Sequence, residues 1–181
     1  MSKLLAFALC DVSVGLLLVA GIMKLSDATT VVGVFSTLRL PARRSWSSVA
    51  RVLGLGEIAV AVSVVAFGGR ATFVALALLY VAFAVVSGVL LARGGADCGC
   101  FGVRSAPITR VHVVVNVVLA AGAVLATVLD APSTLQRLDA GTALGVTYVA
   151  FVALGTVVFV ALLTSAAELV AVRRSVTPRD A

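Results

Sequence analysis

The chain has 181 residues, of which 61% are hydrophobic and 12% are charged, and its formal net charge at pH 7 is +6. Soluble domains carry about twice this charged fraction, so the composition excludes an ordinary soluble domain and predicts a protein of the lipid bilayer. No basic stripe is interleaved with aromatic residues, so we expect no nucleic-acid partner.

Five apolar runs are long enough to cross a bilayer. A helix rises ~1.5 Å per residue and needs about 20 residues to cross about 30 Å of hydrocarbon. Membrane β-strands alternate apolar and polar positions, and these runs do not. The sequence therefore predicts an all-α integral membrane protein, one membrane domain over residues 1–181, in which the first four helices form a bundle. The helices are expected at about residues 4–25, 48–67, 71–92, 108–129 and 143–172.

The first run is interpreted as a retained helix rather than a cleaved signal peptide. It is longer than a signal core of about 7–15 residues, and Leu18 stands where a cleavage site needs a small residue. Asp11 lies inside the run and is expected to face the bundle interior, because an ionisable group is costly in lipid. Cys10 is expected to be a small apolar core residue.

The connection at residues 26–47 and the second run add two further expectations. A short interfacial helix is expected before Pro41, with Trp46 at the level of the lipid headgroups. Glu57 lies at membrane depth in the second run, so it should face the interior. We expect it to be either a neutral carboxyl that is hydrogen-bonded to a neighbouring helix or a partner of Lys24, whose long side chain can reach inward.

The most distinctive segment is the glycine-rich turn at residues 93–107, where Cys98 and Cys100 are separated by one glycine. A disulfide across so small a ring is strained and easily reduced, which favours a redox role. Two thiolates lack about two of the ligands that zinc needs, and His112 is the only histidine, so no metal site is assigned. A CxC metal-transfer site and inert thiols remain the alternatives.

His112 and Asn116 follow this turn and share a helix face, because they are four residues apart. The imidazole could lower the pKa of a thiol or take its proton, or it could be a satisfied interfacial histidine. From their depths in the helices, Glu57, His112 and Asn116 are expected to line one cavity. The catalytic candidates are therefore Cys98, Cys100 and His112, with Lys24, Glu57 and Asn116 as the supporting polar cavity.

The string CGCFG at residues 98–102 resembles the methylamine-utilisation protein MauE family, relatives of the DoxX-like membrane proteins. GIMKL at residues 21–25 resembles the end of that family's first helix, and Glu57 resembles the acidic residue of its second. The resemblance covers about residues 4–130. It implies a helical membrane bundle that supports a thioredoxin-like partner or disulfide formation during maturation of an exported protein.

Basic residues are distributed unevenly between the two sides of the membrane. Eleven of the 14 Lys and Arg residues lie in or beside residues 26–47, the cysteine turn and the C-terminal tail. The other three are Lys3, Arg70 and Arg137. The positive-inside rule therefore predicts a multi-pass protein of the cell (inner or plasma) membrane with its N-terminus outside and its C-terminus inside. The cysteine turn would then face the cytoplasm, whereas the family's role is usually placed at the outer face.

Two functions remain from the sequence. The first is a membrane thiol-disulfide oxidoreductase in which Cys98 and Cys100 cycle between dithiol and disulfide. Its second electron partner would be a quinone or a thioredoxin-like protein. The alternative is a non-enzymatic membrane assembly or transport subunit.

Overall fold

The computed structural model describes residues 2–41, 45–93, 108–138 and 142–176, and the regular secondary structure in these ranges is entirely helical. Five of the described helices are long and apolar enough to cross a membrane, which confirms the prediction of an all-α integral membrane protein. These five are α1 (Ser2–Ser26), α3 (Trp46–Ala66), α4 (Arg70–Ala92), α5 (Arg110–Val128) and α7 (Thr142–Val176). The two short helices are α2 (Thr29–Thr37) and α6 (Thr134–Leu138).

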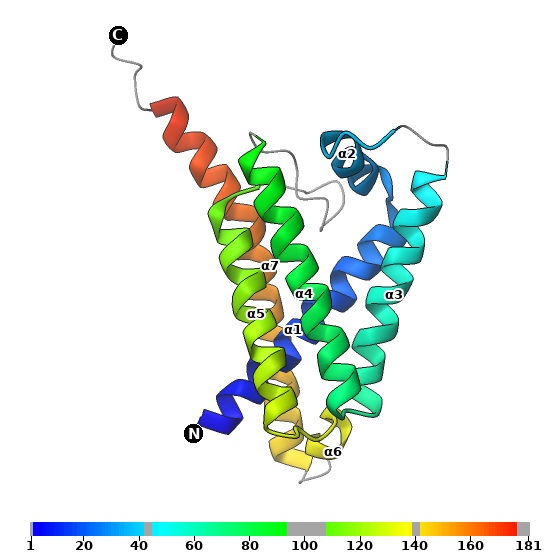
Figure 1. The fold of residues 1–181 in the computed structure, drawn as a ribbon. Coiled ribbons are helices and arrows are strands. Elements are labelled where there is room, and N and C mark those ends of the chain that lie inside the picture. The colour runs from blue at the N-terminus through cyan, green and yellow to red at the C-terminus, as the bar shows by residue number, and fades with distance from the viewer. Residues whose placement is uncertain (1, 42–44, 94–107, 139–141, 177–181) are drawn as a thin grey trace.

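The five long helices run alternately in opposite directions (Figure 1). We call the two ends of the molecule the α2 end and the α6 end, after the short helix at each. The turn between α3 and α4 lies at the α6 end, and the facing ends of α4 and α5 lie at the α2 end. Residues Arg93 and Ile108, which flank the segment that contains both candidate thiols, are therefore at the α2 end.

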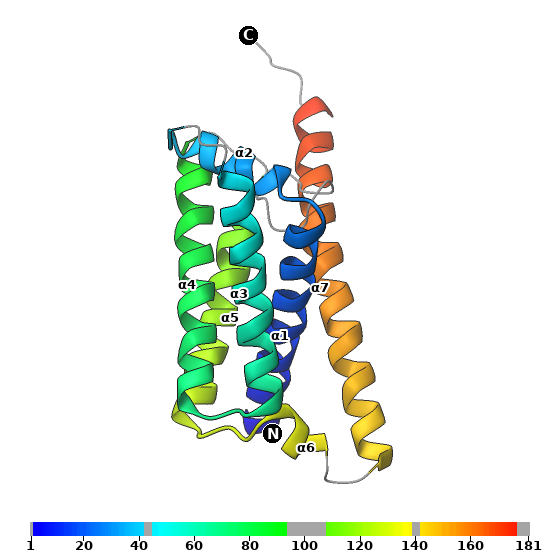
Figure 2. The same cartoon turned by 90° about the vertical axis from the view of Figure 1, so that its right-hand side faces the viewer.

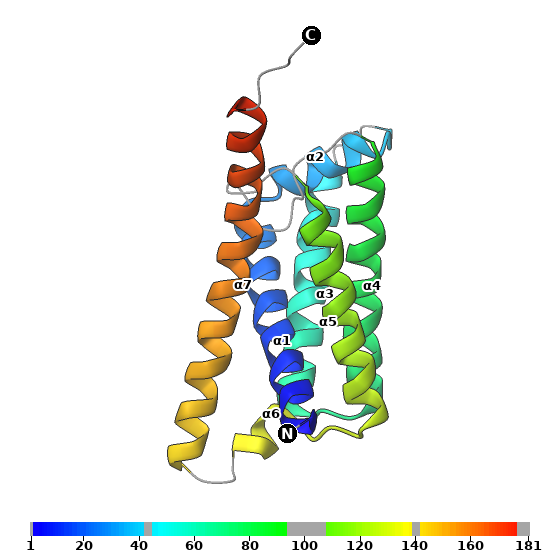
Figure 3. The same ribbon diagram turned by 90° about the vertical axis from the view of Figure 1, so that its left-hand side faces the viewer.

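Helices α1, α3, α4 and α5 form a bundle, and α7 lies against α1 at its side (Figures 2 and 3). The most extensive helix contacts are between α4 and α5 and between α1 and α3. Outward-facing side chains of α7 such as Phe151 and Leu154 are exposed and apolar, as a lipid-facing surface requires. The bundle of four helices that the sequence predicted is therefore present, with the fifth helix beside it.

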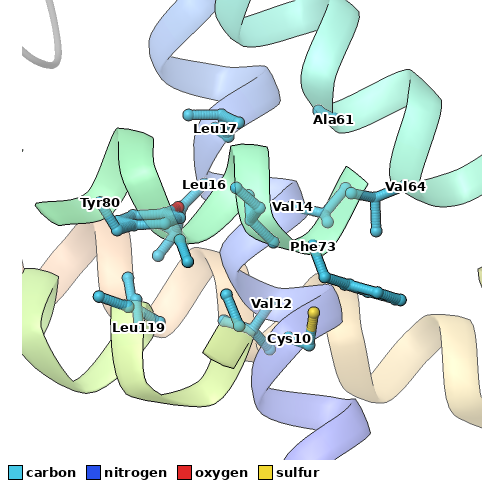
Figure 4. Close-up of a cluster of buried hydrophobic side chains, with 14 of the residues drawn as sticks. Cys10, Val12, Val14, Leu16, Leu17, Ala61, Val64, Phe73, Tyr80 and Leu119 are labelled. Carbon is cyan, nitrogen blue, oxygen red and sulfur yellow. The ribbon is translucent and has the colours of Figure 1, made fainter. Parts of the chain in front are cut away.

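The bundle core is built around α1 (Figure 4). Leu17 from α1, Phe73 from α4 and Leu119 from α5 are almost completely buried there, and Cys10 lies in the same cluster at 1% exposure. This core fixes the positions of the helices that carry the buried polar side chains described below.

A close approach of two glycines sets the spacing of α1 and α3. A Cβ atom at Gly21 would lie 2.8 Å from the carbonyl oxygen of Gly54, and a Cβ at Gly54 would lie 2.8 Å from that of Gly21. Because only glycine leaves this space empty, the two backbones can come together here. The contact lies one turn from Lys24 on α1 and from Glu57 on α3.

The chain leaves α1 through a short polar turn. The Asp27 carboxylate accepts hydrogen bonds from the Thr29 hydroxyl (2.6 Å) and from the Thr29 N–H (2.9 Å). Helix α2 follows and ends before Pro41, whose carbonyl accepts a hydrogen bond from Trp46 Nε1 at 2.9 Å. The Trp46 ring also packs on Phe35 with 4.5 Å between centroids, so the start of α3 is fastened to α2.

Candidate functional site

A buried ion pair joins α1 to α3. Lys24 Nζ lies 2.8 Å from Glu57 Oε2, to which it donates a hydrogen bond, and 2.8 Å from Oε1. The contact with Oε1 lacks hydrogen-bond geometry, so that oxygen has no hydrogen-bond partner among the described residues. Lys24 is 4% exposed and Glu57 is 0% exposed. Of the two partners that the sequence left open for Glu57, the structure places the ammonium of Lys24 against it.

A small cavity lies beside this pair at the α2 end. Its volume is about 30 Å³, which is the space of roughly one water molecule. Lys24, His112 and Asn116 supply polar groups to its wall, and apolar side chains such as Leu17 and Leu119 supply the rest. Glu57 is not part of this wall and reaches the cavity only through Lys24. Of the four polar residues expected at this site, Lys24, His112 and Asn116 therefore line one cavity, and Glu57 does not.

The first turn of α5 fixes the orientation of His112. The backbone N–H of Thr109 donates to His112 Nδ1 at 3.2 Å, and Thr109 Oγ1 lies 3.0 Å from the same nitrogen. An imidazole nitrogen that accepts a hydrogen bond carries no proton, so the neutral ring carries its proton on Nε2. His112 is 3% exposed, and Nε2 has no hydrogen-bond partner among the described residues.

This tautomer bears on the two chemical roles that the sequence left open for His112. The Nε2–H group can donate a hydrogen bond to a thiolate or a carbonyl oxygen. To act as a base, the ring would have to take a proton on Nδ1, which already faces the Thr109 N–H. The geometry therefore favours stabilisation of a negative charge over removal of a proton.

Asn116 extends the polar wall toward α4. Its Nδ2 group donates to Ser87 Oγ at 3.4 Å, across the contact between α4 and α5. Ser87 is 4% exposed, whereas Asn116 is only half-buried. The polar groups of the site consequently come from four helices: Lys24 near the end of α1, Glu57 in the middle of α3, Ser87 near the end of α4, and His112 and Asn116 in the first half of α5.

A second polar cluster surrounds Asp11, whose burial the sequence predicted without a partner. The Asp11 carboxylate lies 2.9 Å from both Nη1 and Nη2 of Arg137. It also accepts hydrogen bonds from the Thr134 hydroxyl at 2.8 Å and from the Tyr148 hydroxyl. Asp11 is 2% exposed and the cluster satisfies it fully, so we assign it to holding α6 and α7 against α1.

The candidate thiols Cys98 and Cys100 lie outside the described residues. The chain connects them to Arg93 at the end of α4 and to Ile108 before α5, at the α2 end where the small cavity lies. Within the described ranges, no three His, Cys, Asp or Glu side chains are grouped so that they could hold a metal ion.

This fold and its buried polar groups define a multi-pass helical membrane protein. The model of the family described as methylamine utilisation protein MauE matches residues 1–129, and the chain belongs to that family. The match covers α1 to α5, so α6 and α7 lie beyond it. No curated protein matches the chain significantly, and no solved structure does.

Proposed function

We propose that this MauE-family protein is a membrane thiol-disulfide redox protein in which Cys98 and Cys100 form the reactive pair. It would support a thioredoxin-like partner or disulfide formation in an exported protein. The observation that carries the proposal is the buried Nε2–H of His112, which has no hydrogen-bond partner among the described residues. It lies at a small cavity, on the helix that follows the cysteine turn. A hydrogen-bond donor in that position can stabilise a thiolate.

The exchange itself follows ordinary thiol chemistry. A thiolate of the pair attacks a disulfide of the partner, forms a mixed disulfide and releases one partner thiolate. The second thiolate of the pair attacks the mixed disulfide, so that the Cys98–Cys100 bond forms and the second partner thiolate leaves. The reverse sequence transfers the disulfide to the partner. A hydrogen bond from His112 Nε2 would favour the thiolate at each stage.

The proposed placement is the plasma membrane, with the N-terminus outside and the α2 end inside. The described basic residues at the α2 end include Arg51, Arg93 and Arg110. At the α6 end, Arg70 is paired with Asp130 and Arg137 with Asp11. The α6 end therefore carries fewer Lys and Arg residues than the α2 end, which supports the predicted orientation.

The experiment is to compare Cys98→Ser, Cys100→Ser and the double variant with Cys10→Ala, whose thiol is buried in the core. We expect all four proteins to insert and fold. The serine variants should lose disulfide exchange, and one single variant should trap a partner in a mixed disulfide. If the double serine variant is fully active and both thiols stay reduced in the wild type, the protein acts as an assembly or transport subunit instead.

A further inference from the structure

A second, larger cavity lies between α1, α2, α3 and α4, next to the first. Its volume is about 180 Å³ and its wall is almost entirely apolar. The aliphatic part of the wall includes Val34, Leu53, Leu79 and Val86. Ala82 lines the cavity and is exposed, so the cavity is open to the surface of the bundle.

The size of this cavity suits one six-membered ring. An apolar protein cavity of about 150 Å³ stays dry and binds benzene. The cavity therefore fits a flat ring that enters from the hydrocarbon of the bilayer.

Two polar residues line this cavity, Lys24 and Ser87, and the Ser87 hydroxyl already accepts a hydrogen bond from Asn116. Lys24 and Phe83 line both cavities and so separate the larger one from the smaller. Lys24 Nζ lies 5.6 Å from the centre of the Phe83 ring and 2.8 Å from both oxygens of Glu57. An ammonium group has three N–H donors, so at least one remains for a further acceptor. A ligand of the cavity should therefore be an apolar ring with a hydrogen-bond acceptor at its edge.

We propose that this cavity binds the ring of a lipid-soluble quinone and that the quinone is the oxidant of the Cys98–Cys100 dithiol. The inference rests on the proposed redox function. The dithiol loses two electrons and two protons as its S–S bond forms, and the quinone gains both and becomes a quinol. Lys24 donates a hydrogen bond to a quinone carbonyl oxygen and stabilises the negative charge that reduction places on it. The cavity lies at the α2 end, where α4 and α5 flank the segment that carries the thiols.

The chain contains its own reporter for this site. Trp46 is the single tryptophan, and its ring packs on Phe35, which lines the larger cavity. Because quinones quench tryptophan fluorescence at short range, titration of the purified full-length protein with decylubiquinone in detergent should give saturable quenching. Unsaturable quenching, linear in quinone, would indicate partition into the micelle only and would overturn the proposal.

Two neighbouring positions on α4 provide a matched pair of variants. Val86→Phe adds a ring inside the cavity, whereas Val85→Phe adds the same ring at a position that is 59% exposed on the outer surface. We expect Val86→Phe to raise the half-saturating quinone concentration about tenfold or more, and Val85→Phe to leave it within about twofold. Equal titrations for the two variants would contradict the site.

The role of Lys24 is tested in the double variant Lys24→Met/Glu57→Gln, which removes the ammonium without leaving a bare carboxylate. We expect this variant to lose saturable quenching while its helix content is unchanged. If it binds decylubiquinone as the wild type does, the cavity takes any apolar ring or acyl chain and the assignment of Lys24 is wrong.

Redox stoichiometry separates this inference from the proposed function. Under anaerobic conditions, the reduced wild type should form one quinol for each Cys98–Cys100 disulfide, and Val86→Phe should not. A wild type that binds decylubiquinone while both thiols stay reduced would overturn the quinone as oxidant. A double serine variant that keeps full function would overturn the redox role itself, and its quinone titration would still report on the cavity.

Discussion

Lys24 Nζ at the end of α1 lies 2.8 Å from Glu57 Oε2 in the middle of α3, and both side chains are buried. The glycine contact between Gly21 and Gly54 brings the two backbones close enough for this ion pair to form. The same lysine stands between the two cavities. One residue thus connects the packing of the bundle to the proposed chemistry.

Glu57→Leu should destabilise the protein by about 3–5 kcal/mol, because it leaves the ammonium of Lys24 buried without a partner. The double variant Lys24→Met/Glu57→Leu should recover most of that loss, since no charge remains buried. Thermal unfolding of the single and double variants in detergent measures the coupling between the two positions. Additive effects of the two substitutions would show that the two side chains do not interact.

Substitution of His112 by Asn or by Gln should distinguish the roles of its two ring nitrogens. Asn matches the position of Nδ1, which faces Thr109, whereas Gln reaches the position of Nε2. We expect His112→Asn to fold but to raise the apparent pKa of the reactive thiol and to slow exchange about tenfold or more, because the donor is lost. His112→Gln should retain more activity. The pH dependence of thiol alkylation measures the effect, and identical profiles for both variants would assign His112 a structural role only.

Arg137→Ala should loosen the attachment of α7, because it leaves the buried carboxylate of Asp11 without its charged partner. Tyr148→Phe removes one hydrogen bond to the same carboxylate and should cost less, about 0.6–2 kcal/mol. Limited proteolysis between α6 and α7 measures the attachment. Phe151→Leu, at an exposed position of α7, is the control and should leave the cleavage rate unchanged.

Hydrogen bonds from the Thr29 hydroxyl and then from the Thr29 N–H lower the pKa of Asp27 below its ordinary value. A lowered pKa in the folded protein means that the carboxylate stabilises the start of α2 at neutral pH. This contribution decreases below about pH 4 and is lost as the pH falls through the lowered value. The chemical shift of the Thr29 amide should follow this titration in the wild type and be constant in Asp27→Asn.

Reporter fusions test the orientation. A reporter after residue 181 should be cytoplasmic, and one inserted in the turn between α3 and α4, at Gly69, should be external. An external C-terminus would place the cysteine turn on the outer side, where disulfides persist.

The five spanning helices could be predicted because a helix that crosses the bilayer needs about 20 consecutive apolar residues, and such a run is visible in the local sequence. Glu57 was found for the same reason, since a carboxyl inside such a run must face other helices. The partner of Asp11 was not found, because Arg137 is 126 residues away and was interpreted as a charge that orients the membrane protein. Its position in a five-residue helix gave no periodic pattern that would have pointed inward. The tautomer of His112 and the larger cavity depend on backbone geometry and on how α2 packs, which no residue pattern specifies.

Helix α1 carries an acid in its first half, Asp11, and a base near its end, Lys24, and each is neutralised by a residue made later in synthesis. The partner of Lys24 is residue 57 and the partner of Asp11 is residue 137, so both partners are synthesised after α1. Until then, α1 would hold uncompensated charge in hydrocarbon, at a cost that a translocation channel or an insertase can avoid by retaining the helix. The order of the ion pairs along the chain thus favours retention of α1 by the insertion machinery until residues 57 and 137 have been made.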